Sequence, residues 1–330
     1  MAAPALAARP AAAAEPARRG TGYTALAVTW AAPDATPAIE VRTLTAAGWS
    51  GWQPLAVDPE GPPTGRGGTR LRWVPGLEDA QVRTAGPAPD DLQLHLIRAE
   101  AEPAPPTPPR PDAAGPQLVA YAGAGPGAPP ILGRAAWGAD PKLMTWPPEY
   151  ASTLKALTIH HSDDGSPNGY AKSDVPRILR AIYRYNAVTR GWGDIGYNFL
   201  VDRFGRIWEG RAGGVDRPVV GAHAGGFNRA TCGIAVLGNY NAAPYSDPAR
   251  AAVAALGAWK LGAYGRDPHG TVTIVSTGGG TSRFPKGQKV TLPVVMGHRD
   301  TGNTDCPGGA GYAQLPSLRD QISDKLRDPR

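Results

Sequence analysis

A proline- and glycine-rich stretch from Glu100 to Pro130 constrains the fold more than any other feature of this sequence. Its first part reads EAEPAPPTPPRPDAAGP and its last part reads AGAGPGAPP. Proline stiffens the first part and glycine loosens the second, so neither part can contribute a packed core. We therefore expect a linker at residues 101–130 between one domain at residues 21–100 and a second domain at residues 131–330.

The segment before the linker has the pattern of short β-strands. Runs such as TALAVTW, AIEVRTLT and LQLHLI alternate in polarity and are separated by Gly, Pro or Asp. This pattern predicts an antiparallel, jelly-roll-like β-sandwich. We expect Trp49, Trp52 and Trp73 to fill its small core, although exposed tryptophans could instead stack on sugar rings. Residues 1–20 are rich in Ala and Pro, and we expect them to form the disordered start of an exported chain.

The segment after the linker alternates between helix and strand patterns. A first helix is expected after Asp174, because apolar residues recur there at i, i+3, i+4 and i+7: Val175, Ile178, Leu179 and Ile182. YNFLVD and RIWE predict a hairpin, and Asp247 with Pro248 opens a second helix. The expected fold class is therefore α/β, with a central mixed sheet flanked by helices, preceded by the smaller all-β sandwich.

Composition and charge exclude several classes of function. Hydrophobic residues make up 42% of the 330 positions, and no apolar run approaches the roughly 20 residues that span a bilayer. The net charge of +6 is spread along the chain, without a basic run interleaved with aromatics, so we expect no nucleic-acid partner. The only cysteines are Cys232 and Cys306, which excludes a disulfide framework. Cys232 lies in TCGIAVLG, which predicts a buried strand with a free thiol.

The segment VVMGHRDTGNTDCPGG combines a histidine and a cysteine in the pattern of a metal site. His298 and Cys306 are eight positions apart, joined by a loop of Gly, Thr, Asn and Asp that follows an apolar strand. A third ligand could come from LKALTIHHS, where a β-prone run leads directly into His160 and His161. Nitrogen and sulfur ligands together favour zinc.

Several motifs resemble those of one family. They are RAAWGADP, TIHHS, WGDIGYNFLVDRFGRIWEGR, GAHAGGFN, IAVLGN and MGHRD with TDCPG, in that order along the chain. The set is similar to the peptidoglycan recognition proteins and the phage-lysozyme-type N-acetylmuramoyl-L-alanine amidases. The resemblance covers about 200 residues, from Ile131 to about Leu326.

The resemblance implies a role for particular residues. His160, His298 and Cys306 correspond to the family's zinc ligands, which leave an open position for water. Tyr197 of the GYNF motif would hydrogen-bond the water or the tetrahedral oxyanion. Thr304 stands where relatives have Thr or Lys, and its hydroxyl could stabilise an oxyanion but is a poor base. Substrate-binding positions implied in the same way are His161, His223 and Asn228.

The implied function is zinc-dependent hydrolysis of the amide bond between N-acetylmuramic acid and L-alanine in bacterial peptidoglycan. The expected protein is a secreted, cell-wall-associated monomer with muropeptides as its partner. Two alternatives stay open at this point. One is a peptidoglycan-binding protein without catalysis, and the other is a cysteine hydrolase with Cys306 as nucleophile and His298 as base.

Overall fold

A computed structural model of the protein describes residues 23–31, 37–58, 66–98, 127–163, 168–279 and 281–327. The expected disordered segment at residues 1–20 and most of the expected linker, residues 101–126, lie outside these described residues. No helix in the described part of the chain combines the length and the apolar character needed to cross a membrane.

Two antiparallel sheets form the N-terminal part of the structure. One sheet has the order β5-β6-β1-β7 with β9 also paired to β1, and the other has the order β3-β2-β4 with β8 also paired to β2. Leu26, Val28 and Ile39 are among the buried side chains that fill one core shared by strands of both sheets. The strands are β1 (Tyr23–Trp30), β2 (Ile39–Thr45), β3 (Gly48–Trp49), β4 (Gln53–Leu55), β5 (Val57–Asp58), β6 (Gly67–Thr69), β7 (Arg72–Leu77), β8 (Asp79–Thr84) and β9 (Gln93–Arg98).

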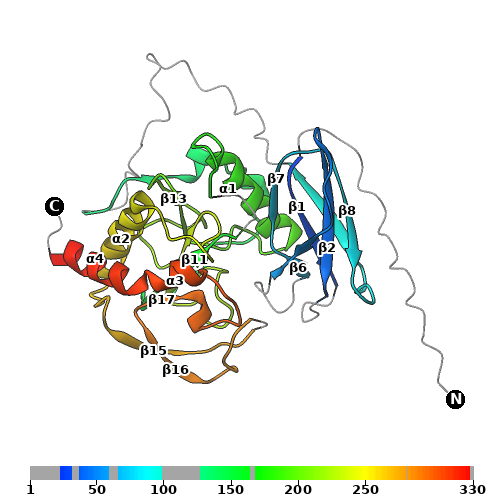
Figure 1. The fold of residues 1–330 in the computed structure, drawn as a ribbon. Coiled ribbons are helices and arrows are strands. Elements are labelled where there is room, and N and C mark those ends of the chain that lie inside the picture. Colours follow the sequence, from blue (N-terminus) through cyan, green and yellow to red (C-terminus); the bar gives the residue numbers. More distant parts are fainter. Residues whose placement is uncertain are drawn as a thin grey trace, which may run out of the picture.

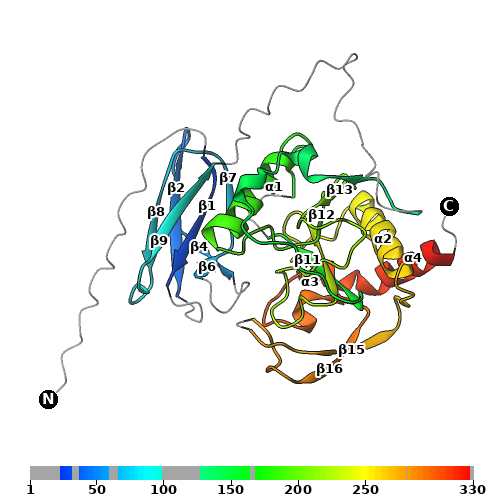
Figure 2. The same cartoon turned by 180° about the vertical axis from the view of Figure 1, so that it is seen from behind.

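Strand β1 is buried on both of its faces. Leu26, Val28 and Trp30 point into the core between the two sheets. Ala25 and Ala27, on the opposite face, belong to a different core that also contains residues of the C-terminal part. Because side chains alternate along a strand, one strand can join two cores in this way. Figures 1 and 2 show the N-terminal strands lying directly beside helix α1 (Val175–Arg184).

A six-stranded mixed sheet organises the C-terminal part. Its order is β10-β13-β12-β14-β11-β17, and all neighbours are parallel except the hairpin of β12 with β13. The strands are β10 (Ile131–Leu132), β11 (Ala156–His161), β12 (Phe199–Val201), β13 (Ile207–Glu209), β14 (Thr231–Val236) and β17 (Val295–Gly297). The chain therefore has the α/β fold with a mixed sheet that its sequence pattern predicts.

Helices cover both faces of this sheet. On one face, Ile234 and its alternate neighbours pack with residues of α2 (Asp247–Gly262) and α4 (Leu315–Arg327). On the other face, Ala235 and Leu200 pack with α1, and Leu71, Trp73 and Ile97 of the N-terminal sheet join the same core. A short helix α3 (Gly309–Ala313) precedes α4. The N-terminal sheet thus completes one covering layer of the α/β sheet.

Several local expectations from the sequence can be compared with the structure. Between α2 and β17 the chain forms an antiparallel hairpin of β15 (Thr271–Val275) and β16 (Lys289–Pro293). Helix α1 begins at Val175 as expected, but Asp174 does not cap it, since its carboxylate accepts the N–H of Ala171 instead. Cys232 is a buried free thiol, also as expected.

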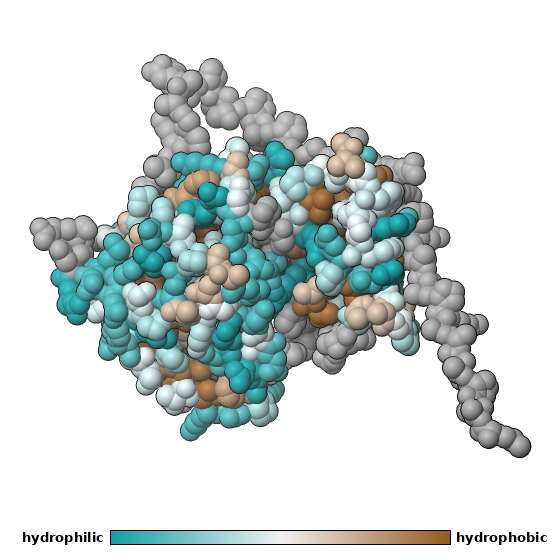
Figure 3. All heavy atoms as spheres, in the orientation of Figure 1, coloured by the Kyte–Doolittle hydropathy of each residue, from teal (hydrophilic) through white to brown (hydrophobic). Residues whose placement is uncertain are grey.

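The prediction that three tryptophans fill the sandwich core is wrong. Trp49 is 40% exposed and Trp52 is only partly buried. Trp73 is buried, but it lies in the core shared with α1 and not between the two N-terminal sheets. The guanidinium of Arg42 stacks over the rings of Trp49 and Trp52, at 4.9 Å and 5.1 Å from their centroids. The face of the molecule drawn in Figure 3 is mostly hydrophilic, with hydrophobic residues in small separate groups.

Candidate functional site

Two parallel strands bring a pair of histidines together at one edge of the mixed sheet. Strands β11 and β17 run in register, with Ile159 opposite Gly297, so His160 and His298 follow at the same level. Their ring centroids are 4.7 Å apart. In open α/β sheets the carboxyl ends of parallel strands are where binding sites form.

The loop after His298 returns Cys306 to the same place. The Asp300 carboxylate fixes the start of this loop, since it accepts hydrogen bonds from the Gly297 N–H at 2.9 Å and the Tyr312 hydroxyl at 2.6 Å. The Cys306 Sγ then lies 3.6 Å from Nδ1 of His160. The potential ligand atoms of His160, His298 and Cys306 all lie within 4.8 Å of one another, and all three residues are buried.

This donor set fits a zinc ion. Burial, together with a smaller contribution from the neighbouring histidines, lowers the pKa of His298 to about 3 and the pKa of His160 well below its ordinary value. Both imidazoles are therefore neutral at physiological pH, which is the form that binds a metal. Two neutral imidazoles and one thiol, which binds as the thiolate, are a characteristic zinc set.

His223 lies behind the first of these histidines. Its Nδ1 is 3.1 Å from Nε2 of His160, so the Nδ1 of His160 is the atom turned toward Cys306. A second imidazole in this position fixes the orientation of the ring. Asn228 shapes the turn that carries His223, because its Oδ1 accepts the backbone N–H groups of His223 and Ala224.

Two expected hydroxyl-bearing residues border the site. The ring of Tyr197 is 5.2 Å from that of His160, and Tyr197 is partly buried. The Thr304 Oγ1 accepts the backbone N–H of Cys306 at 3.2 Å. The third expected neighbour, His161, is not part of the ligand cluster, and its Nδ1 accepts the N–H of Tyr240 at 3.3 Å.

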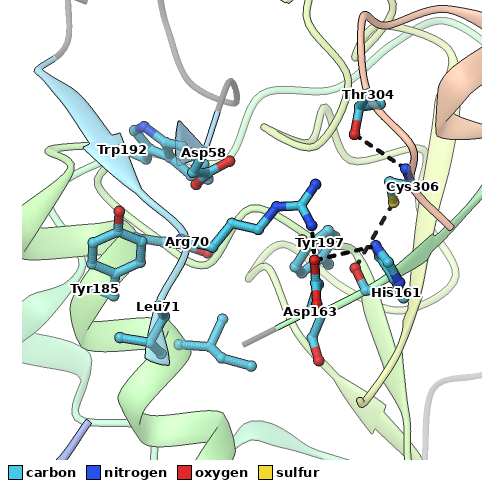
Figure 4. Close-up of a pocket in the computed structure, with 13 residues that line it drawn as sticks. Asp58, Arg70, Leu71, His161, Asp163, Tyr185, Trp192, Tyr197, Thr304 and Cys306 are labelled. Atoms are coloured by element: carbon cyan, nitrogen blue, oxygen red, sulfur yellow. Dashed lines mark hydrogen bonds and ion pairs between the residues drawn. The ribbon is translucent and has the colours of Figure 1, made fainter. Parts of the chain in front are cut away.

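A cavity of about 50 Å³ opens over Cys306, and both parts of the chain line it. Tyr197, Thr304 and His161 line it from the C-terminal part. The remaining wall includes Asp58, Arg70 and Leu71 of the N-terminal sheet, as the close-up in Figure 4 shows. No local sequence pattern marks these three residues as part of the site, because the segments that meet here lie far apart in the chain.

A second, larger cavity adjoins the first through Trp192, which lines both. Its volume is about 350 Å³, and Asn228 and Arg211 are among the residues around it. Thr277, Gly278 and Gly279 of the segment between β15 and β16 form another part of its wall. One cavity thus lies over the metal-type cluster, and the larger cavity shares the Trp192 wall with it.

The structure therefore defines a class of protein: a mixed α/β domain with a buried His-His-Cys cluster of the zinc type at the carboxyl edge of its parallel strands. Within the chain, residues 150–309 match the sequence model of a family described as N-acetylmuramoyl-L-alanine amidase. The chain belongs to the family of peptidoglycan recognition proteins and N-acetylmuramoyl-L-alanine amidases.

Individual relatives show how far this similarity extends. Peptidoglycan-recognition protein SC2 of Drosophila simulans is 31% identical over 181 residues, which cover 54% of this chain and 80% of that protein. Human N-acetylmuramoyl-L-alanine amidase is 33% identical over 194 residues, which cover 57% of this chain but only 28% of the human protein. Among solved structures, wild-type Drosophila PGRP-LB aligns with a TM-score of 0.44 and 26% identity, over 57% of this chain and 92% of that one.

Proposed function

We propose that this protein is a zinc-dependent amidase that hydrolyses the bond between N-acetylmuramic acid and L-alanine in bacterial peptidoglycan. We further propose that it is secreted and acts at the cell wall as a monomer. The observation that carries the proposal is the close approach of His160, His298 and Cys306, whose ligand atoms lie within 4.8 Å of one another. Binding of peptidoglycan without cleavage requires no metal ligands. A buried thiol between two neutral imidazoles therefore favours the amidase over a protein that only binds peptidoglycan.

When bound by these three side chains, zinc would lower the pKa of a water molecule and polarise the scissile carbonyl. Other residues of the chain would hold and orient the three ligand side chains. His223 fixes the ring of His160 through the 3.1 Å contact between their nitrogens. This contact keeps Nδ1 of His160 directed at Cys306.

We propose that two hydroxyl groups, of Thr304 and Tyr197, stabilise negative charge on the substrate carbonyl oxygen. Thr304 accepts a hydrogen bond from the N–H of Cys306 with its Oγ1, which leaves its hydroxyl hydrogen available to donate. Tyr197, two residues before β12, lines the same cavity. Donors that already point at the position of the developing charge contribute to catalysis because they need no reorganisation.

The proposed substrate would extend from the small cavity over Cys306 into the larger cavity beyond Trp192. Sugar and peptide groups both present faces for stacking and carbonyl or hydroxyl groups for hydrogen bonds. Trp192 and Arg211 offer an aromatic face and a cation on this path. These residues support binding of a muropeptide, which joins a sugar to a short peptide.

The test is digestion of purified cell wall with the protein before and after treatment with a chelator. We expect release of free stem peptides, loss of release with the chelator, and recovery when zinc is added. Absence of cleavage under every metal condition would leave peptidoglycan binding as the function. Cleavage that resists the chelator but is blocked by thiol alkylation would instead indicate Cys306 as a nucleophile.

Replacement of one ligand provides a second test. We expect Cys306→Ser to lower zinc affinity and cleavage by at least about a hundredfold, because a serine hydroxyl is a far poorer zinc ligand than a thiolate. The matched control is Cys232→Ser, since Cys232 is also a buried free cysteine but lies outside the cluster. Full activity of Cys306→Ser would refute the assignment of this ligand.

A further inference from the structure

An arginine from the N-terminal sheet enters the site between two acidic residues of the C-terminal part. Arg70 lies in the short connection between β6 and β7. Its guanidinium forms ion pairs with Asp163 and with Asp305, the latter at 2.9 Å. Figure 4 shows the Arg70 side chain extending across the cavity toward Asp163, His161 and Cys306.

The two acidic partners lie on the two segments that carry the cluster. Asp163 follows strand β11, three residues after His160, and Asp305 immediately precedes Cys306. One further side chain holds each of these acidic residues in place. Asn239 donates to Oδ1 of Asp163 at 2.5 Å, and the Arg299 guanidinium donates to the backbone carbonyl of Asp305. Arg70 is therefore a bridge between the strand that holds His160 and the loop that holds Cys306.

The electrostatics of this bridge favour its charged form. Burial alone would lower the pKa of Arg70, but the hydrogen bond and the charge of Asp305 outweigh it and the pKa is raised. The Arg70 side chain is 18% exposed and that of Asp163 is 12% exposed, so solvent screens this pair only weakly. A planar guanidinium can serve two carboxylates at once, which an ammonium group does less well.

The short connection between β6 and β7 that carries Arg70 is anchored to the C-terminal part. Leu71, next in the chain, lies in the same apolar core as Leu179 and Ile182 of α1. The Tyr185 hydroxyl donates to the backbone carbonyl of Thr69, immediately before Arg70 in the chain. Parts of a chain that share a large apolar core do not move freely against each other. Arg70 is therefore presented from a rigid support.

We propose that Arg70 is a positioning residue of the metal centre, which clamps the segments of His160 and Cys306 at the separation that zinc requires. This inference rests on the proposed zinc site and deepens it: the site of this chain is completed by its N-terminal sheet. The sheet is then a structural part of the catalytic centre and not a detachable spacer. Removal of groups that orient metal ligands costs about ten- to a hundredfold in metal affinity.

The experiment measures zinc affinity of the full chain by competition with a chromophoric chelator, for the wild type, Arg70→Ala and Arg70→Lys. The control is Arg72→Ala, because Arg72 is two residues away but donates to Gln53 and Pro54 within the N-terminal sheets. We expect Arg70→Ala to bind zinc about ten- to a hundredfold more weakly, Arg70→Lys to be intermediate, and Arg72→Ala to equal the wild type.

Cobalt absorption gives a readout of geometry that does not depend on activity. We expect the visible bands of the cobalt-loaded Arg70→Ala protein to differ from those of the wild type, and those of Arg72→Ala to match it. If Arg70→Ala does not fold, Asp305→Asn replaces it, since that change removes one partner at a side chain that is 58% exposed. It should weaken zinc binding in the same direction.

Two results would overturn the inference. One is zinc affinity within twofold of the wild type, with an unchanged cobalt spectrum, in Arg70→Ala or in its replacement. The other is faster cleavage by Arg70→Ala at unchanged zinc affinity, which would make Arg70 an obstruction at the entrance. A wild-type protein that binds zinc but releases no peptide refutes the proposed amidase activity, and the affinity ratio still decides the role of Arg70. A wild type that binds no zinc refutes both.

Discussion

The ion pair between Asp58 and Arg190 allows a quantitative test of how the N-terminal sheet is attached. Asp58 ends strand β5, and Arg190 follows the π-helical turn Tyr185–Thr189 after α1. Their side chains are 2.7 Å apart and only 13% and 3% exposed. Burial lowers the pKa of Arg190, but Tyr185 and Asp58 raise it by more, so the guanidinium stays charged at every accessible pH.

The perturbation is Asp58→Asn, which keeps the shape of the side chain and removes its charge. Loss of one partner of a buried pair costs about 3 to 5 kcal/mol because the other charge stays buried. We expect the lower end, about 3 kcal/mol, since the asparagine oxygen still accepts one hydrogen bond from Arg190. With a urea slope of about 2 kcal/mol per M, the unfolding midpoint should fall by about 1.5 M.

The matched control is Asp247→Asn, which breaks the pair of Asp247 with Arg250 at the start of α2. Asp247 is 85% exposed in this pair, so its loss should cost no more than about 1 kcal/mol. Urea unfolding followed by tryptophan fluorescence compares the two variants. If Asp58→Asn and Asp247→Asn shift the midpoint equally, the pair is not buried in solution and the proposed rigid attachment fails.

Two further predictions concern packing and pH. Gly68→Ala should destabilise the protein by about 1 to 3 kcal/mol, because a Cβ would lie 2.9 Å from the Tyr185 hydroxyl, whereas Gly51→Ala has open space and should change thermal stability little. With a chelator present, stability should be full above pH 6.5 and fall as the pH is lowered. Burial depresses the pKa of His161, His223 and His298 from 6.5 to about 3, so the unfolded chain binds protons that the folded chain does not. The loss from pH 7 to 5.5 should be about 4 kcal/mol for these three groups in urea titrations, and equal stability at both pH values would show that these imidazoles are solvated.

Local sequence patterns predict much of this fold because the periodicity of a helix or a strand depends only on residues close together in the chain. The alternation of Cys232, Ile234 and Val236 indicates a buried strand, and the structure places these residues on one face of β14. The i, i+3, i+4 spacing of Val175, Ile178 and Leu179 likewise gives the buried face of α1. Such periodicities follow directly from helix and strand geometry.

The three predicted metal-type ligands could also be found from sequence, but their setting could not. His298 and Cys306 share one motif, and His160 ends a recognisable strand, so their convergence in the structure follows from adjacent parallel strands. Arg70 shows no such signal, because it is 235 residues from Asp305 and many arginines occur in the chain.

The exposure of the Trp49 side chain could not be predicted from the sequence for a related reason. Its strand β3 has only two residues, Gly48 and Trp49, which is too short for an alternation that would distinguish the inner from the outer face. Polarity alone then favours burial. The stacking of Arg42 over Trp49, which supplies a partner on the surface, depends on the pairing of β2 with β3 and is visible only in the structure.

The two-faced burial of β1 has a consequence for dividing this chain. If the polypeptide were cut between residues 98 and 127 and the two pieces were pulled apart, the fragment with β1 would expose Ala25 and Ala27, and α1 would expose Ile182 and its apolar neighbours. Each fragment would thus offer the other a matching apolar surface. We expect the two pieces to elute together in size-exclusion chromatography as a noncovalent complex. The N-terminal sheets would then behave like a tightly bound subunit of the C-terminal part.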